Sequence, residues 1–230
     1  MKIENSVILI TGGASGLGKS MVRYFSERGA IVYACDLNKE KGEKLEKESS
    51  GKIKYINCDI TDDESVKKLI ETIKNEQGKL DVVINSAGIA NADILATEKS
   101  MHSNSIFEKV VKVNTFGSFL VSKYAAKLMI DNYDAKKDCN GVIILIASIA
   151  GFEGQKGQTA YSASKGALIG MALPMARDLG KYKIRVNAIA PGVIETPMIK
   201  GFRDTRVGKN ILDNTPLKTF GKPEHISQTS

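Results

Sequence analysis

The sequence contains few of the residues that build disulfide frameworks, zinc sites or histidine-dependent active sites. Among its 230 residues there are 3 cysteines, 2 histidines and no tryptophan. The cysteines are Cys35, Cys58 and Cys139, an odd number with no CxxC pair. We therefore interpret them as reduced thiols of an intracellular protein and exclude a zinc site. Two histidines, His102 and His225, are too few for a histidine-based metal site or triad.

Long hydrophobic runs are also missing. No stretch reaches the roughly 18 apolar residues that a transmembrane helix needs, so no membrane association is expected. With 42% hydrophobic and 26% charged residues, 21 glycines and 5 prolines, the composition is that of an ordinary globular protein. This excludes a disordered chain, a collagen-like repeat and a disulfide scaffold. Residues 1–6 lead directly into an apolar segment, so we expect no cleavable presequence, whereas an internal import signal stays open.

The chain alternates short apolar segments with longer helical patterns. Strands are predicted at 7–11, 31–36, 53–57, 81–85, 141–147 and 184–190. Helices are predicted near 17–28, 39–49, 62–76, 104–132 and 159–180. The strand segments are rich in β-branched residues and almost wholly apolar, which is typical of strands buried on both faces. The alternation predicts an α/β fold: a Rossmann-type, doubly wound parallel sheet with helices on both faces.

The turn after the first strand has a pattern typical of phosphate binding. TGGASGLG at 11–18 follows that strand and opens a helix. Gly12, Gly16 and Gly18 permit a tight turn and a close approach of the backbone to a pyrophosphate at the helix N-terminus. The hydroxyl of Ser15 adds a polar contact. Because the strand–turn–helix context agrees with the motif, we predict a dinucleotide site here.

Asp36 ends the second predicted strand, 18 residues after Gly18. A carboxylate at this position accepts hydrogen bonds from an adenosine ribose and repels a 2′-phosphate. Leu37 follows it and the glycine loop contains no Arg or Lys, so we predict NAD(H) rather than NADP(H). Two alternatives stay open: Asp36 merely caps a loop, or Lys19 and Lys39 are recruited to a phosphate.

Two later strand ends fit the same ligand. Asp59 and Ile60 in CDIT at 58–61 follow the third strand, where an adenine can be held. Asn85 and Ser86 begin NSAG, a small turn after the fourth strand. Each turn alone is more typical of ordinary loop structure than of a ligand site. Together with the glycine turn, they place polar groups along the carboxyl edge of the sheet, where α/β proteins bind ligands.

Tyr161 and Lys165 provide the candidate acid–base chemistry. Their spacing of four residues puts both on one face of a predicted helix. A nearby ammonium stabilises a phenolate, so we expect the pKa of Tyr161 to fall below about 10 and the residue to act as an acid or base. A YxxxK pair alone is usually solvated helix surface. Ser148, 13 residues before Tyr161 at the end of a buried strand, favours the functional interpretation.

These motifs together resemble the short-chain dehydrogenase/reductase superfamily over essentially the whole chain. The resemblance rests on TGGASGLG, Asp36, NSAG, Asn114, Ser148, YSASK and the APG at 190–192. It implies a catalytic tetrad of Asn114, Ser148, Tyr161 and Lys165. In that arrangement Ser148 and Tyr161 bind the substrate oxygen, and Tyr161 transfers its proton. Lys165 holds the nicotinamide ribose, and Asn114 positions a water that relays the proton.

Residues 152–180 and the following IRVNAIAPGVIETPM are similar to the mitochondrial members that act on 3-hydroxyacyl-CoA or hydroxysteroids. This implies NAD(H), an acyl-CoA or steroid substrate, a homotetramer and the mitochondrial matrix, with the cytoplasm as the alternative. The resemblance implies substrate contacts by Ser148, Gln155 and Tyr161. It implies cofactor contacts by Ser15, Leu17, Asp36, Asp59, Ile60, Ser86, Tyr161, Lys165, Ile194 and Thr196. Ile194 replaces a bulkier aromatic residue, so packing near the nicotinamide is expected to differ.

The same resemblance divides the single domain, residues 1–230, into functional parts. The cofactor half covers about 1–90, the catalytic half about 91–200 and the substrate lid about 191–215. Superfamily members continue beyond the last residues of this chain with the rest of a helix and a seventh strand. We therefore expect 184–190 to lie at an unpaired sheet edge.

Three functions are compatible with these residues. Asp36 and the long match at 152–180 favour an NAD-dependent 3-hydroxyacyl-CoA dehydrogenase. A hydroxysteroid dehydrogenase or a 3-oxoacyl-carrier-protein reductase is the second reading, and a preference for NADPH would indicate the reductase. The third is a scaffold subunit of mitochondrial tRNA processing. The net charge of +7 gives it weak support, because the lysines are spread out and no RNA-binding motif is present. Any role toward nucleic acid would therefore be indirect.

Overall fold

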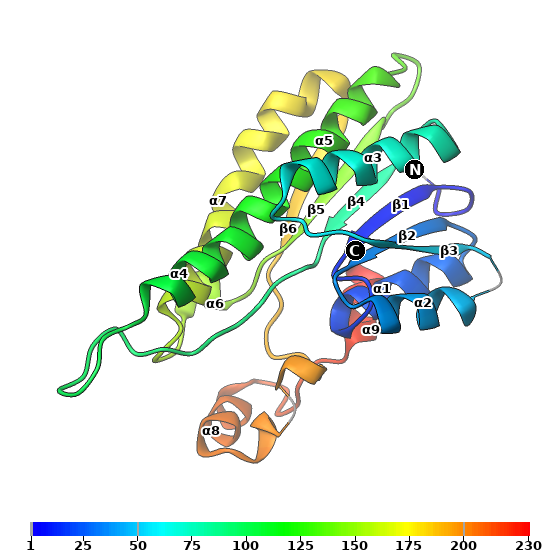
Figure 1. Cartoon of the computed structure of the whole chain (residues 1–230). Helices are drawn as coiled ribbons and strands as arrows, with labels where there is room; N and C mark the ends of the chain where they lie inside the picture. Colours follow the sequence, from blue (N-terminus) through cyan, green and yellow to red (C-terminus); the bar gives the residue numbers. More distant parts are fainter. Residues whose placement is uncertain (1, 50, 200) are drawn as a thin grey trace.

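The protein is a parallel sheet between two layers of helices in the computed structural model, which describes residues 2–49, 51–199 and 201–230 (Figure 1). The strands are β1 (Val7–Thr11), β2 (Ile31–Asp36), β3 (Ile53–Asn57), β4 (Val82–Asn85), β5 (Gly141–Ile146) and β6 (Ile184–Ile189). Their order is β3-β2-β1-β4-β5-β6, and all neighbours are parallel. The order reverses between β1 and β4, so the predicted doubly wound sheet is confirmed.

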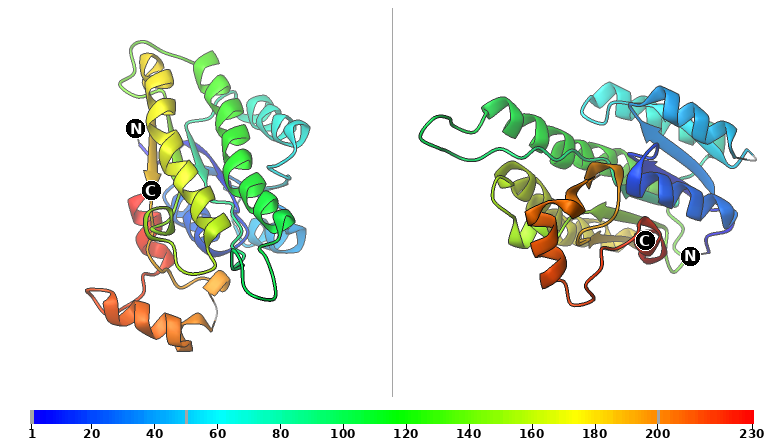
Figure 2. Two further views of the ribbon diagram at one scale, coloured as in Figure 1. Left: turned by 90° about the vertical axis from the view of Figure 1, so that its left-hand side faces the viewer. Right: turned by 90° about the horizontal axis from the view of Figure 1, so that it is seen from below.

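Helices cover both faces of the sheet. They are α1 (Gly16–Glu27), α2 (Lys39–Lys47), α3 (Asp63–Gln77), α4 (Asn104–Val111), α5 (Ser118–Asp131), α6 (Ala150–Glu153), α7 (Thr159–Leu179), α8 (Arg206–Asn214) and α9 (Pro223–Thr229). Short turns of other helix types are η1 (Lys112–Gly117), η2 (Gly180–Tyr182), η3 (Pro197–Ile199) and η4 (Phe202–Asp204). One face packs against α1, α2 and α9, and the other against α3, α5 and α7 (Figures 1 and 2). None of the described helices has the length and hydrophobicity to cross a bilayer.

The central strands β1, β2, β4 and β5 are almost wholly apolar because each contributes to two hydrophobic cores, whereas the edge strand β6 departs from the predicted apolar pattern and exposes Arg185 and Asn187. In β1, Leu9 packs with the α3 and α5 side, whereas Ile8 and Ile10 pack with the α1 side. All three side chains are buried to 1% exposure or less. Successive side chains of a strand point to opposite faces, so a strand covered on both faces shows no alternation of polar and apolar residues. The central strands thus form a rigid base whose carboxyl ends carry the polar turns.

One predicted helix is divided by a wider turn. The segment predicted as a single helix over 104–132 consists of α4, the π-helical turn η1 and α5. Within η1, Gly117 leaves room for Ile60, because a Cβ at this glycine would lie 2.7 Å from the Ile60 side chain. The hydroxyl of Ser118 donates to the carbonyl oxygen of Asn114 at 2.7 Å. Single-turn π segments are frequent at functional sites, and this one contains Asn114.

The predicted lid contains a helix that the sequence pattern did not reveal. The described part of 191–215 holds η3, η4 and α8, which lies apart from the sheet (orange in Figure 1). The backbone N–H of Glu195 donates to the oxygen of Gly221, and the N–H of Gly221 donates to the oxygen of Val193, both at 2.9 Å. These two hydrogen bonds hold the start of the segment against the chain that follows α8. The strand that precedes this segment, β6, pairs only with β5 among the described strands and lies at a sheet edge, as predicted.

Candidate functional site

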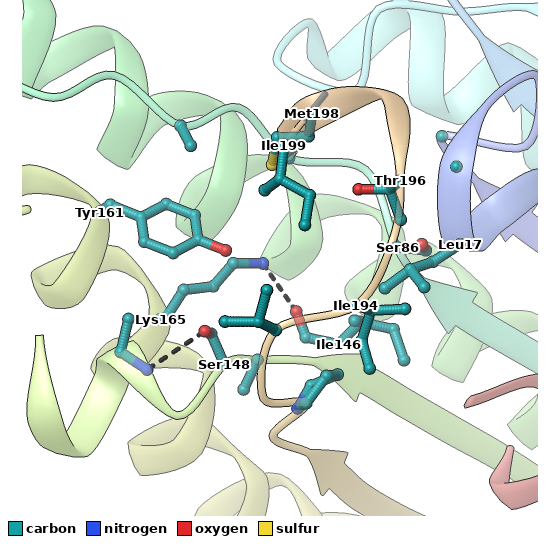
Figure 3. A pocket seen from close by; sticks show the side chains of 18 of the residues that line it. Leu17, Ser86, Ile146, Ser148, Tyr161, Lys165, Ile194, Thr196, Met198 and Ile199 are labelled. Carbon is teal, nitrogen blue, oxygen red and sulfur yellow. Dashed lines mark hydrogen bonds between the residues drawn. The ribbon is translucent and has the colours of Figure 1, made fainter. Parts of the chain in front are cut away.

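A cleft of about 1070 Å³ opens at the carboxyl ends of the strands, beside the point where the strand order reverses. Figure 3 shows part of its lining. Most residues predicted as site residues line this cleft: Gly12, Ser15, Gly16, Leu17, Gly18, Asp36, Asp59, Ile60, Ser86, Ser148, Gln155, Tyr161, Lys165, Ile194 and Thr196. The cleft therefore joins the predicted nucleotide residues to the predicted reaction residues. Among the described residues, no group of three or more acidic, histidine or cysteine side chains is placed to hold a metal ion.

The glycine turn requires its glycines for steric reasons. Gly12 has a φ of +67°, and a Cβ there would lie 2.9 Å from the backbone of Ala87. A Cβ at Gly18 would lie 2.1 Å from the backbone oxygen of Gly12. Helix α1 can therefore begin directly against the turn only when glycine occupies both positions. This packing brings the N-terminus of α1 to the cleft.

The start of α1 suits a bound anion. Ser15 is its N-cap, and the Ser15 side chain makes no capping hydrogen bond. The first turn holds no acidic residue. The first N–H groups of a helix lack partners within the helix and carry a partial positive charge. Together with the neighbouring glycines, these groups form a cradle that fits a pyrophosphate.

Asp36 is fixed in orientation at the end of β2. Its Oδ2 accepts from the N–H of Ala14 at 3.1 Å, and its Oδ1 accepts from the N–H of Asn38 at 2.9 Å. A carboxylate has about four acceptor positions, so two remain for ribose hydroxyls. Lys39 forms an ion pair with Glu43 at 3.7 Å. This contact directs Lys39 along α2, which weakens its case as a phosphate ligand.

Tyr161, Lys165 and Ser148 converge on the opposite wall (Figure 3). The Lys165 side chain runs beneath the Tyr161 ring, and its Nζ lies 5.7 Å from the ring centre. The same Nζ donates to the carbonyl oxygen of Ile146 at 2.7 Å. Ser148 Oγ accepts from the N–H of Ala150 at 3.1 Å. The turn that follows β5 and the helix α7 thus bring all three functional groups to one wall of the cleft.

The expected lowering of the Tyr161 pKa is wrong for this arrangement. Burial raises the pKa of Tyr161 above 10, and the hydrogen bond from Ser148 offsets this only in part. Burial also lowers the pKa of Lys165 from 10.5 to about 8. Desolvation of the phenolate is thus the dominant cause of the change in the Tyr161 pKa, and Lys165, four residues away, does not reverse it.

Asn114 does not line the cleft, but its side chain holds two segments that do. Its Oδ1 accepts from the N–H of Ile89 at 2.8 Å, and its Nδ2 donates to the oxygen of Ile89 at 3.0 Å and to Ser164 Oγ at 2.9 Å. A Cβ at Gly88 would lie 3.2 Å from Asn114 Oδ1 and 3.5 Å from Lys165 Nζ. The amide therefore clamps the turn after β4 to helix α7, next to the lysine.

Asn85 also lies outside the cleft lining, in contrast to the predicted cofactor contact. It is 1% exposed, and its Nδ2 donates to Ser122 Oγ at 3.0 Å. Its place at the end of β4 suggested a ligand contact, but the side chain points into the layer between the sheet and α5. The neighbouring Ser86 does line the cleft.

Sequence reasoning gave the lid only as the range 191–215 and missed the individual residues by which its helix lines the cleft. Asn210, Ile211 and Asn214 line it from α8. Ile211 and Asn214 follow Asn210 by one and four residues, so all three lie near one face of a helix. This spacing was the signal in the sequence that could have identified them. Gln158 also lines the cleft and accepts from the N–H of Gln155 at 2.9 Å, which fixes the turn that carries Gln155.

Comparisons with known proteins agree with this site. A sequence model of the family described as short chain dehydrogenase matches residues 6–207. The 3-hydroxyacyl-CoA dehydrogenase type-2 of Drosophila melanogaster is 41% identical over 199 residues, which cover 86% of this chain and 78% of the relative. The 3-oxoacyl-acyl-carrier-protein reductase FabG of Thermotoga maritima is 38% identical over 231 residues, which cover 99% of this chain and 89% of the relative.

A solved structure gives the same result. A short-chain type dehydrogenase/reductase from Mycobacterium ulcerans has a TM-score of 0.89 at 25% identity, covering 100% of this chain and 82% of that chain. Dehydrogenases of this family use nicotinamide cofactors, and the cleft described above has the cradle that such a cofactor requires. The chain belongs to the short-chain dehydrogenase family and is an oxidoreductase.

Proposed function

We propose that the protein interconverts 3-hydroxyacyl-CoA and 3-oxoacyl-CoA, with NAD(H) as the hydride carrier. The observation that carries the proposal is the convergence of Tyr161, Ser148 and Lys165 in one cleft with Asp36. The names of the relatives support the substrate class, because both the acyl-CoA dehydrogenase and the carrier-protein reductase act on a 3-oxoacyl thioester or its alcohol.

The chain's own residues would bind the substrate oxygen and move its proton. Ser148 Oγ accepts from the backbone N–H of Ala150, and its single proton, which otherwise faces the Tyr161 phenol, would turn to the substrate oxygen. Tyr161 lies beside it and exchanges a proton with the same oxygen, as a phenol in reduction and as a phenolate in oxidation. Lys165, held by the Ile146 carbonyl, supplies positive charge near the phenol. When bound in the cleft, the nicotinamide cofactor would supply the hydride-transfer chemistry, and these three residues would position the substrate oxygen for it.

The nucleotide end would distinguish the two dinucleotides by charge. The glycine turn would hold the pyrophosphate, Asp36 the ribose, and Asp59 and Ile60 the adenine. Repulsion between a carboxylate and a phosphate charge about 4 Å away amounts to about 1 kcal/mol in water and about 4 kcal/mol at the effective dielectric of a protein surface. NADP(H) would therefore bind between about fivefold and about a thousandfold more weakly than NAD(H).

This preference is tested by Asp36→Asn. The asparagine side chain keeps one oxygen that can accept a hydrogen bond from a backbone N–H, as Asp36 does from Ala14 and Asn38. We expect kcat/KM with NADPH to rise relative to kcat/KM with NADH, because the repulsive charge is removed. Asp134→Asn is a matched control: Asp134 also accepts from a backbone N–H, that of Lys136 at 2.9 Å, and it lies outside the cleft lining. An unchanged NADH/NADPH ratio in Asp36→Asn would contradict the role given to this carboxylate.

The substrate class is tested by oxidation of NADH and of NADPH with three ketones. The panel is acetoacetyl-CoA, acetoacetyl-carrier protein and a ketosteroid. The proposal expects the highest kcat/KM for acetoacetyl-CoA with NADH. A preference for the carrier-protein thioester with NADPH would instead identify the second candidate, a 3-oxoacyl-carrier-protein reductase. That candidate is favoured by the relative that aligns with 99% of this chain.

We further propose a homotetramer that works in the mitochondrial matrix. Exposed aromatic side chains along α4, η1 and α5 support self-association, since Phe107, Phe116 and Phe119 are 38%, 44% and 44% exposed. Light scattering of the purified protein tests the assembly, and a monomer at micromolar concentration would contradict it. Fractionation of cells that express the full-length protein tests the compartment.

A further inference from the structure

Two cysteines lie side by side at the nucleotide end of the cleft. Cys35 is in β2, directly before Asp36, and Cys58 follows β3, directly before Asp59. Both are free thiols, both are buried and both line the cleft. The strand register pairs Cys35 with Ile56, so Cys58 is two residues further along the neighbouring strand. Residues two apart point to the same face, and both thiols belong to the same hydrophobic cluster.

The two cysteines are joined by a hydrogen bond and differ in the direction of their pKa shifts. Cys35 Sγ donates to the carbonyl oxygen of Cys58 over 3.9 Å. The interaction of the two side chains lowers the pKa of Cys58. The same interaction, followed by burial, raises the pKa of Cys35. This difference in direction favours Cys58 as the nucleophile and Cys35 as the partner that keeps its proton.

We propose that Cys35 and Cys58 form a peroxide-sensitive dithiol that closes the nucleotide end of the cleft when it is oxidised and that bound dinucleotide protects. The Cys58 thiolate attacks one oxygen of hydrogen peroxide, the O–O bond breaks, and the departing hydroxide takes up a proton to become water. The Cys35 sulfur, losing its proton, then attacks the Cys58 sulfenic acid, the S–O bond breaks, and a second water leaves. Two thiols are oxidised to one disulfide, and one peroxide is reduced to two waters.

Closing this disulfide requires backbone movement at the cofactor site. With strands about 4.8 Å apart and a rise of about 3.3 Å per residue, diagonal residues two apart are separated by about 8 Å between Cα atoms. A disulfide needs a Cα separation of about 4.4–6.8 Å. The chain after β3 must therefore move toward β2, and this chain carries Asp59 and Ile60, which line the cleft. Oxidation would narrow the space assigned to the adenine.

The first experiment treats the protein with hydrogen peroxide, with and without saturating NADH. We expect peptide mass spectrometry without reductant to find Cys35 joined to Cys58 in the sample treated alone, and much less in the NADH-loaded sample. Fluorescence titration of the oxidised protein should show NADH binding weakened by roughly 10- to 100-fold, the cost of losing one hydrogen bond to a charged group. Dithiothreitol should restore binding. Absence of the Cys35–Cys58 linkage would overturn the proposal.

Variants separate this pair from other oxidation. Cys35→Ser and Cys58→Ser should each lose the dithiothreitol-reversible response, and Cys35→Ala is the alternative if the serine variant does not fold. Cys139→Ser is the matched control and should respond like the wild type, since Cys139 lies outside the cleft lining. An equal reversible response in Cys58→Ser would also overturn the proposal. The inference rests on the nucleotide site of the proposed function. Failure of the reduced protein to bind NADH would refute that function, whereas linkage mapping tests the dithiol without any cofactor.

Discussion

Replacing Lys165 by methionine should abolish turnover and change how fold stability depends on pH. Lys165 is 4% exposed, and burial lowers its pKa from 10.5 to about 8. At pH 7 the folded protein therefore holds a protonated amine in an environment that favours the neutral form. At about 1.4 kcal/mol for each pH unit between the two pKa values, this costs the fold about 3 kcal/mol.

Lys165→Met also removes an interaction, which lowers the free energy of unfolding. Methionine retains the apolar stem but leaves the carbonyl oxygen of Ile146 without its donor, since Lys165 Nζ supplies that hydrogen bond at 2.7 Å. An unpartnered buried carbonyl costs about 1–3 kcal/mol. At pH 7 we therefore expect Lys165→Met to unfold with a free energy equal to that of the wild type or up to about 2 kcal/mol higher.

The sign of the pH dependence follows from the direction of the pKa change. Between about pH 8 and 10.5 the unfolded chain binds more protons at Lys165 than the folded chain does, so wild-type stability gains from this residue as the pH rises. Lys165→Met lacks this gain. Its advantage over the wild type should therefore shrink by about 2 kcal/mol between pH 7 and pH 9.5.

The assay is urea denaturation of both proteins at the two pH values. Lys68→Met is the control: this lysine is exposed on α3, and its variant should keep the wild-type pH dependence. If Lys165→Met and the wild type changed equally between pH 7 and pH 9.5, the reasoning about the buried ammonium would be refuted. The expected result, a loss of the variant's advantage between pH 7 and pH 9.5, would show that Lys165 serves the active site and lowers the stability of the fold.

Three further substitutions test the site. Tyr161→Phe should nearly abolish turnover but keep NADH binding in a fluorescence titration, and unchanged turnover would exclude the proposed mechanism. Gly18→Ala should weaken NADH binding and lower the Tm, because its Cβ would lie 2.1 Å from a backbone oxygen, whereas Gly170→Ala meets nothing within 4 Å and should do neither. Ser164→Ala removes the acceptor of one Asn114 hydrogen bond and should lower the unfolding free energy by about 1–3 kcal/mol in urea denaturation.

The sheet was predictable because its signal is local. A strand buried on both faces is almost wholly apolar, and glycine or polar turns mark the ends both of such strands and of the half-buried edge strand β3, so β1, β2 and β3 match their predicted ranges residue by residue. The glycine turn, Asp36 and the Tyr161–Lys165 pair were found for a similar reason. Each is defined by spacing within one strand–turn–helix unit or one helix face.

The side-chain contacts and local changes that sequence reasoning missed depend on distant partners. Asn85 is occupied by Ser122, 37 residues away, and Asn114 by Ser164, 50 residues away. The π-helical turn is a wider hydrogen-bonding pattern inside an otherwise helical segment, which hydrophobic periodicity does not resolve. The pKa of Tyr161 depends on how much water the fold removes from the phenol, and spacing to Lys165 carries no information about that.

The two backbone hydrogen bonds that join Gly221 to Val193 and Glu195 make the intervening segment an insert with a fixed attachment point. Closing a longer loop on the same attachment costs only about 0.6 kcal/mol for each doubling of its length. The α8 region can therefore be exchanged or extended without disturbing β5 and α7, which carry the proton-transfer groups. Replacing this insert by that of a relative with another substrate offers a direct route to altered specificity, while the strand and helix that carry the catalytic residues stay unchanged.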